Sequence, residues 1–166
     1  MTITEIINGD LLTSNEKYIA QQCNCVTVKS SGLAKSIATK YPYADIYTLR
    51  NSLNYINGKN SIPGTINISY PDLSNKGPNV VHMFAQYFPG KPKKYSKFYA
   101  NPFNYKDDRD MRLEWFKECL YIIEENKEIT RLGMPYQIGC GLAGGNWNEY
   151  LFLLNNSKIP IFLYKI

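Results

Sequence analysis

The segment 79–88, "NVVHMFAQYF", most constrains how this chain folds. Its centre is apolar at both odd and even positions. A strand with one face in water alternates apolar and polar residues, whereas a strand covered on both faces is apolar almost throughout. We therefore expect an interior strand whose sheet carries helices on both faces.

Strand and helix patterns alternate around this segment. Further strands are predicted at 3–8, 17–23, 64–70, 134–140 and 159–165. A long loop, 89–107, follows the interior strand, and loops of that length inside a compact domain are usually functional or mobile. Alternating strands and helices predict an α/β fold with a mixed sheet, in three α/β/α layers.

Four helices are predicted from apolar residues at helical spacing and from their caps. The first follows Gly32, and the fourth runs from Asn146, which forms a capping-box pattern with Glu149, to about Asn156. The third begins after Asp107-Asp108. The apolar residues of the first three helices are, in chain order, Leu33, Ile37 and Tyr41; Ile46, Leu49, Leu53 and Ile56; and Met111, Trp115, Cys119, Ile122 and Ile123.

Length and composition narrow the class of protein. The 166 residues, 44% hydrophobic, suit one globular domain spanning 1–166. No apolar run approaches the roughly 20 residues of a membrane span, and the N-terminus lacks a signal-peptide pattern. We expect a cytoplasmic monomer with four reduced cysteines. One histidine and no CxxC pair predict neither a metal site nor a cofactor.

The stretch "IGCGLAGGNW" (138–147) is the clearest candidate for a binding loop. It leaves the carboxyl end of a predicted strand and enters a helix. Glycines let backbone N–H groups approach a ligand without a Cβ in the way, and a helix N-terminus favours anions. The pattern indicates a phosphate or pyrophosphate cradle; the alternative is a flexible strand-to-helix turn. It matches neither the P-loop nor the GxGxxG spacing.

A second polar stretch, "CNCVTVKSSG" (23–32), also lies between a predicted strand and a helix. It offers backbone donors, the Asn24 amide and the hydroxyls of Thr27, Ser30 and Ser31. Ligands of open α/β sheets bind outside the carboxyl ends of the strands, so two such loops at one sheet edge would form a cleft. An ordinary connection is the alternative.

Taken together, "NGDLL", "QQCNC…SSGLAKSIATKYP", "HMFAQ" and "MPYQIGCGLAGGNW" resemble a macro domain over nearly the whole chain, in order. The resemblance is strongest to the branch of ADP-ribose-1″-phosphate phosphatases and terminal ADP-ribose glycohydrolases. It implies that the chain binds ADP-ribose, its 1″-phosphate or ADP-ribosylated macromolecules. It further implies removal of the terminal phosphate from ADP-ribose-1″-phosphate, or cleavage of a related ADP-ribosyl bond.

The resemblance also assigns positions in the cleft. Asp10 would accept a hydrogen bond from the adenine amino group, with the Leu11 backbone beside the ring, although Asp10 is equally suited to cap a turn. Asn24 would face the distal ribose, and Tyr105 or Phe103 would stack near the adenine or cover the ribose. The residues expected to straddle the diphosphate and terminal ribose are Ser30, Ser31, Gly32, Leu33, Gly139, Cys140, Gly141, Leu142, Ala143, Gly144 and Gly145.

The chain departs from the glycohydrolase pattern at one place. Those members carry an aspartate about where Ala143 stands, and Asn146 is not acidic either. Without a carboxylate, acid–base chemistry loses its partner. Candidate catalytic residues are then Asn24, Lys29 as a phosphate-stabilising cation, and Cys140 as a nucleophile. A solvated lysine and a thiol packed under the loop are the alternatives for the last two, and His82 is interpreted as a core residue.

Two other functions remain open. The first is a module that binds ADP-ribose without catalysis. The second is a binder of single-stranded nucleic acid, because "KPKKYSKFYANPFNY" interleaves basic and aromatic residues and the net charge is +5. No recognised RNA-binding motif accompanies that stretch.

Overall fold

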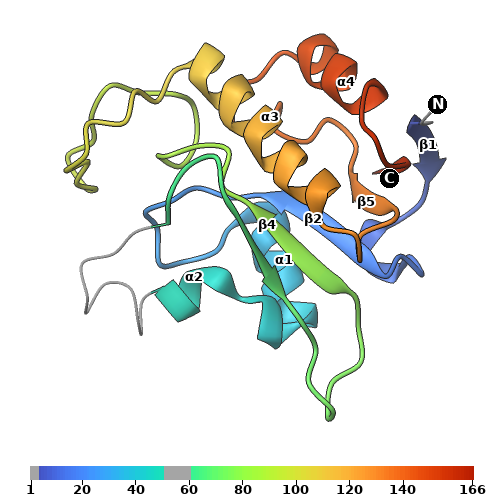
Figure 1. Cartoon of the computed structure of the whole chain (residues 1–166). Helices are drawn as coiled ribbons and strands as arrows, with labels where there is room; N and C mark the ends of the chain where they lie inside the picture. Colours follow the sequence, from blue (N-terminus) through green and yellow to red (C-terminus); the bar gives the residue numbers. More distant parts are fainter. Residues whose placement is uncertain (1–3, 51–60) are drawn as a thin grey trace.

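The computed structural model describes residues 4–50 and 61–166, and within them six strands form one mixed sheet (Figure 1). The strand order is β1-β6-β5-β2-β4-β3, and only the β3–β4 pair is antiparallel. The strands are β1 Thr4–Asn8, β2 Tyr18–Gln22, β3 Ile66–Ser69, β4 Asn79–Met83, β5 Leu132–Pro135 and β6 Ile161–Lys165.

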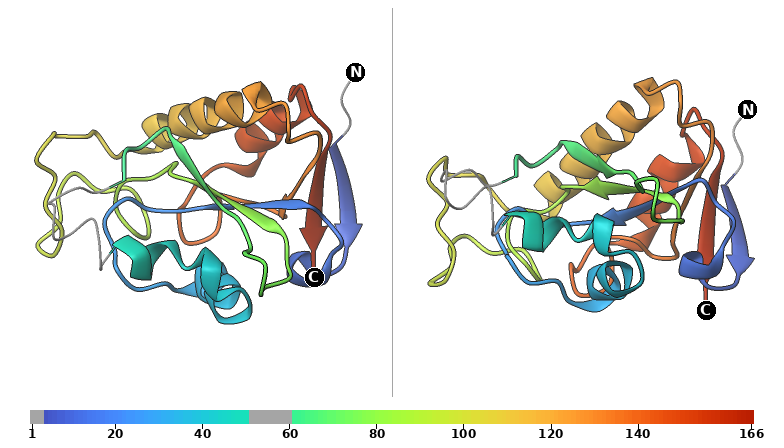
Figure 2. Two further views of the ribbon diagram at one scale, coloured as in Figure 1. Left: turned by 60° about the horizontal axis from the view of Figure 1, so that its bottom comes forward. Right: turned by 90° about the horizontal axis from the view of Figure 1, so that it is seen from below.

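Helices cover both faces of the sheet, as Figure 2 shows. Helices α3 (Arg109–Glu125) and α4 (Trp147–Asn155) lie on one face. Helices α1 (Gly32–Lys40) and α2 (Ile46–Leu49) lie on the other. Two 3-10 turns, η1 (Leu11–Thr13) and η2 (Pro42–Ala44), complete the described helical elements. The predicted α/β/α architecture with a mixed sheet is confirmed.

The interior strand lies where the continuous apolar pattern places it. Strand β4 pairs with β2 on one side and β3 on the other. Successive residues of β4 serve opposite faces: Val80 packs with Ile37 of α1, and Val81 belongs to the cluster that contains Phe116 of α3. Because both faces of β4 are buried, its sequence does not alternate between apolar and polar residues as that of a half-exposed strand does.

Three predicted strands are clearly shorter than expected, and one of them is β3, which covers 66–69 rather than 64–70. Beyond Met83 the chain leaves the sheet, yet 84–88 stays buried because its backbone pairs with loops: the Cys25 N–H donates to the Tyr87 carbonyl at 2.9 Å. Strand β5 covers 132–135 rather than 134–140. The chain turns after Pro135, whose carbonyl accepts from the Ile138 N–H at 3.1 Å, and Gln137 and Gly139 have positive φ.

Some helix faces also differ from the prediction. Ile122 is exposed, because the buried face of α3 is turned toward Phe116, Leu120 and Ile123. Leu49, the last residue of α2, is exposed as well. The predicted helix positions Leu53 and Ile56, and the start of the first strand at Ile3, lie outside the described residues. No helix in the described part of the chain is long and apolar enough to cross a membrane.

Candidate functional site

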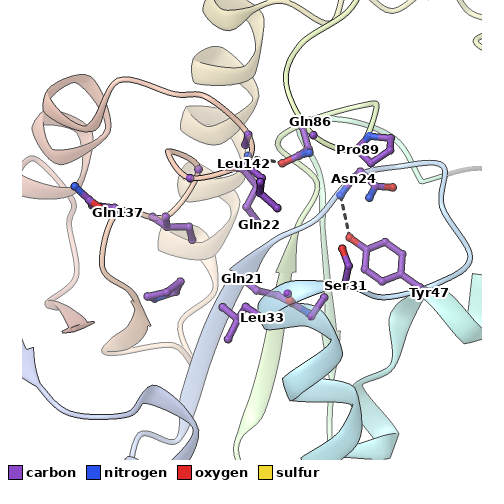
Figure 3. A pocket seen from close by; sticks show the side chains of 18 of the residues that line it. Gln21, Gln22, Asn24, Ser31, Leu33, Tyr47, Gln86, Pro89, Gln137 and Leu142 are labelled. Atoms are coloured by element: carbon purple, nitrogen blue, oxygen red, sulfur yellow. Dashed lines mark hydrogen bonds between the residues drawn. The ribbon is translucent and has the colours of Figure 1, made fainter. Parts of the chain in front are cut away.

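A cleft of about 370 Å³ opens at the carboxyl ends of β2 and β5 (Figure 3). Pockets of this size hold small molecules and cofactors in other proteins. The polar side chains in its wall are mainly amides: Gln22 and Gln86 are hydrogen-bonded at 2.8 Å, and Asn24 lies beside Tyr47. The two stretches that follow β2 and β5 contribute opposite walls, so the predicted pair of loops at one sheet edge is confirmed.

The start of α1 forms one wall of the cleft. Gly32, Leu33 and Ala34 line it, and Ser31 at the N-cap makes no capping hydrogen bond with its side chain. The first N–H groups of a helix have no partner inside the helix. Within the described residues, no acceptor meets the N–H groups of Gly32, Leu33 and Ala34. This wall therefore presents unused donors at the positive end of a helix dipole.

The glycine loop forms the facing wall and uses only part of its backbone internally. The N–H groups of Cys140, Gly144 and Gly145 donate to the carbonyls of Gln137, Gly141 and Gly139. In contrast, the N–H groups of Gly141, Leu142 and Ala143 find no acceptor among the described residues, and all three residues line the cleft. Successive free N–H groups of this kind make an anion-binding concavity.

The four glycines of the loop are present for different physical reasons, which the position of an added Cβ shows. A Cβ on Gly139 would lie 2.8 Å from both Gln22 Oε1 and the Tyr150 ring, and a Cβ on Gly145 would lie 2.6 Å from the same ring. A Cβ on Gly145 would also lie 2.6 Å from the Gly139 carbonyl oxygen, and Gly139 has a positive φ, so both glycines are required by the protein's own packing and backbone. A Cβ on Gly144 would meet Lys91 and Pro92, outside the cleft, whereas one on Gly141 meets nothing within 4 Å.

A buried arginine holds the loop after β2 in shape. Arg50 is 1% exposed and donates to the carbonyls of Asn24 and Thr27 at 2.9 and 2.7 Å. Its guanidinium also lies over the Tyr47 ring, 5.1 Å from the centroid. Asn24 Oδ1 accepts from the Val26 and Thr27 N–H groups, so only the Nδ2 donors of Asn24 remain for a ligand.

A second buried arginine joins the glycine loop to the segment 88–90, which lies after β4. Arg112 of α3 donates through Nη1 to the carbonyls of Gly90 and Ala143, at 2.6 and 3.1 Å. Through Nη2 it donates to Asp107 at 2.8 Å and to the Phe88 carbonyl at 3.0 Å. The Arg112 and Asp107 side chains are 2% and 0% exposed. This clamp fixes the glycine loop against the 88–90 segment.

Sequence reasoning missed both arginines, although Arg112 carried a detectable signal. It stands four residues before Phe116 and eight before Leu120, on the apolar face of an amphipathic helix. A charge in that position needs a buried partner. Arg50 carried no comparable signal.

The structure gathers some of the predicted site residues and separates others. Those that line the cleft are Asn24, Lys29, Ser31, Gly32, Leu33, Gly139, Gly141, Leu142 and Ala143. Those outside its lining are Asp10, Leu11, Ser30, Cys140, Gly144, Gly145 and Tyr105. Asp10 caps η1 by accepting from the Leu12 N–H at 2.9 Å. Tyr105 packs on Tyr87 and Trp115.

The electrostatics of the site limit its chemistry. The cleft lining contains Lys29 but no carboxylate or imidazole. Burial raises the pKa of the Cys140 thiol to about 11, so that it is protonated at neutral pH and is not an activated nucleophile. Within the described residues, no three His, Cys, Asp or Glu side chains are grouped to hold a metal ion.

His82 is a core residue, as expected. Its Nδ1 lies 3.0 Å from the Gln21 amide and its Nε2 lies 2.8 Å from the Ser69 hydroxyl. Burial is the main reason that its pKa is lowered to about 3. Gln21 itself lines the cleft, but both ring nitrogens of His82 are engaged and the fully buried ring is not part of the cleft lining.

No protein-family model matches the sequence, and no curated protein matches it. Solved structures resemble it throughout. The macrodomain of Thermus aquaticus DarG has a TM-score of 0.66 at 15% identity, and both chains are covered completely, at 100% each. Thermosipho africanus DarTG in complex with ADP-ribose has a TM-score of 0.64 at 18% identity, covering 97% of this chain and 41% of that one.

A mutant macrodomain of Oceanobacillus iheyensis with ADP-ribose has a TM-score of 0.60 at 16% identity, covering 98% of this chain and 84% of that one. Identities this low show the fold alone. The order of strands, the helices on both faces and these likenesses lead to one conclusion: the chain has the macrodomain fold.

Proposed function

We propose that this chain is a single-domain macrodomain that binds ADP-ribose in the cleft between α1 and the glycine loop. The diphosphate lies between the two walls, the distal ribose faces Asn24, and the adenine lies toward Asp10. Two of the similar solved structures, those of Thermosipho africanus and Oceanobacillus iheyensis, carry ADP-ribose. The diphosphate of that ligand is negatively charged, which matches the N–H donors of the two walls.

One observation carries the proposal. Two sets of three backbone N–H groups, Gly32–Ala34 and Gly141–Ala143, lack acceptors within the described residues and line the same cleft. Donors in a cleft that lack protein partners must be satisfied by water or by a ligand. An anion with oxygens on both sides, such as a diphosphate, suits both walls at once.

Calorimetric titration of ADP-ribose into wild type and Gly141→Val tests this proposal. A Cβ at position 141 meets no atom within 4 Å, so the valine adds bulk at the donor wall without a clash in the protein. We expect at least tenfold weaker binding, since N–H groups kept from their acceptors cost about 1–3 kcal/mol each. Thr130→Val, just before β5 at the opposite sheet edge, is the control.

Binding of ADP-ribose to Gly141→Val with wild-type affinity would show that the ligand does not use this wall. A wild-type protein that binds no ADP-ribose would refute the proposed function as a whole. Unchanged thermal unfolding of both variants establishes that the comparison is between folded proteins.

A second candidate is hydrolysis of the terminal phosphate of ADP-ribose-1″-phosphate. Lys29 and Asn24 line the same cleft, and together they offer a cation and an amide donor for phosphate charge. The variant Asn24→Asp keeps the oxygen that holds the Val26 and Thr27 N–H groups and removes the Nδ2 donors.

Phosphate release is measured for wild type, Asn24→Asp and Lys29→Met, with and without chelator. If hydrolysis occurs, we expect it to be slow and unaffected by chelator. Each variant should lower kcat more than it raises KM, because the residues act on the reacting end. Tight ADP-ribose binding without phosphate release leaves the binding module as the function.

A further inference from the structure

The loop 89–106 concentrates the positive charge of the molecule. It contains five lysines and no acidic residue, so its net charge equals the +5 of the whole chain. Outside it, lysines and arginines equal aspartates and glutamates in number. Lys106 pairs with Asp108 at 3.4 Å. Lys91, Lys93, Lys94 and Lys97 are exposed and make no ion pair with a described residue.

Aromatic rings stand among these lysines on the surface. Tyr95, Phe98 and Phe103 are 76%, 85% and 76% exposed. Large rings with most of their area in water lose apolar hydration when something covers them. Three such rings on one cationic loop indicate a partner with flat π faces and negative charge.

The loop is held in place at several points. Its start is fixed by the bond from Arg112 to the Gly90 carbonyl, and the Tyr87 hydroxyl donates to the Ala100 carbonyl at 2.9 Å. The Asn101 side chain bonds both the N–H and the carbonyl of Tyr105, at 2.9 and 2.8 Å. In Figure 1 the loop, drawn in yellow-green, projects from the body of the molecule beyond the N-terminal end of α3.

We propose that the surface formed by Lys91, Lys93, Lys94, Tyr95, Lys97 and Phe98 binds single-stranded nucleic acid. The lysines would contact backbone phosphates, and the rings would stack on unpaired bases. Stacking tolerates any sequence because every base has a π face, whereas a duplex keeps its bases inside. Acidic protein segments offer charge without unpaired bases. An anionic membrane suits both lysines and rings, and the vesicle arm of the test distinguishes it from a single strand.

This surface borders the cleft without being part of it. Arg112 bonds both Gly90, where the loop begins, and Ala143 of the glycine loop. A strand on the loop would therefore pass the mouth of the cleft while the cleft remains open to a small ligand. The inference does not depend on what the cleft binds.

Fluorescence anisotropy with a labelled single-stranded oligonucleotide tests the proposal. The triple variant Lys93→Ala, Lys94→Ala, Lys97→Ala should bind at least tenfold more weakly at low salt. The slope of log affinity against log salt concentration should also fall in magnitude by about 2. Each lysine that contacts a phosphate of a single strand contributes about 0.7 to that slope, and three are removed. The control removes three exposed lysines elsewhere, Lys117, Lys127 and Lys158, and should bind nearly as wild type does.

The variant Tyr95→Ala, Phe98→Ala isolates stacking from charge. It should weaken binding about fivefold or more and leave the salt slope unchanged, because it removes rings and no charge. ADP-ribose titration provides an independent check, since neither loop variant alters the cleft lining. Failure of oligonucleotide binding would leave the cleft assignment standing.

Three results would overturn the proposal. The first is equal oligonucleotide affinity in the triple variant and its lysine control. The second is wild-type affinity in the aromatic variant, which would reduce the contact to charge alone. The third is tighter binding of a matched duplex, of polyglutamate or of anionic vesicles than of the single strand.

Discussion

Arg112 should contribute both to the stability of the fold and to the shape of the cleft, and the variant Arg112→Met, with and without Asp107→Asn, should distinguish the two contributions. The guanidinium bonds Asp107 and the carbonyls of Phe88, Gly90 and Ala143. Without it, the fully buried Asp107 carboxylate keeps the Phe88 N–H, 2.9 Å away, as its remaining bonded donor. Removing one partner of a buried ion pair costs about 3–5 kcal/mol, a large part of the 5–15 kcal/mol that stabilises a typical domain.

The double variant Arg112→Met, Asp107→Asn should restore most of that stability. It leaves no buried charge at these two positions, and the asparagine oxygen still accepts from the Phe88 N–H. It does not restore the donor that joins Gly90 to Ala143, so the glycine loop is no longer tied to the 88–90 segment. We therefore expect the double variant to have nearly the unfolding free energy of wild type but to bind ADP-ribose about tenfold more weakly or worse.

Urea unfolding gives the stability of each variant, and calorimetry gives its affinity for ADP-ribose. Arg109→Met is the matched control: Arg109 is exposed and pairs with Glu149 at 3.5 Å, an interaction worth at most about 1 kcal/mol. The reasoning fails if Arg112→Met costs less than about 1 kcal/mol. It also fails if the double variant binds ADP-ribose as tightly as wild type, because the clamp would then not shape the cleft.

Three further predictions concern single residues. Burial lowers the pKa of His82 to about 3 in the folded state, against 6.5 when unfolded, so below pH 6.5 the unfolded state binds more protons. In urea unfolding, the unfolding free energy of wild type should therefore fall by about 2 kcal/mol more than that of His82→Gln between pH 7 and pH 5. Cys140→Ser should leave any phosphate release unchanged, and iodoacetamide should label the protonated thiol slowly; a rate loss of tenfold would contradict this. Asp10→Ala should cost about 1 kcal/mol of stability as a lost cap and weaken ADP-ribose, but not ribose-5-phosphate, in calorimetry; equal losses would leave only the cap.

Local patterns in the sequence determine the layers of this protein and the sheet edge where its candidate site lies. The continuous apolar run at 79–88 requires cover on both faces, and the strand-to-helix positions of 23–32 and 138–147 follow from neighbouring residues alone. Two loops that leave parallel strands must emerge at the same sheet edge. The cleft was predictable for that reason, as was the core position of His82.

Tertiary structure decided what each loop residue does. Gly139 and Gly145 are required by the packing of Tyr150 of α4, by the positive φ of Gly139 and by the approach of the Gly139 carbonyl to Gly145. Their spacing in the sequence does not distinguish these reasons from a ligand cradle. Strand β5 ends at Pro135 although apolar residues continue, because turn and loop hydrogen bonds take the backbone beyond it. Tyr105, predicted to lie beside the ligand, packs in an aromatic cluster with Tyr87 and Trp115.

The two buried arginines show most clearly why sequence reasoning stops short. Arg112 bonds Ala143 across 31 residues, and Arg50 bonds Asn24 across 26. Periodicity reports which face of an element is buried, but it carries no information on the distant carbonyl that a buried charge will meet. Such a pairing exists only once the sheet has brought separate loops together, so the shape of the cleft is a property of the folded chain.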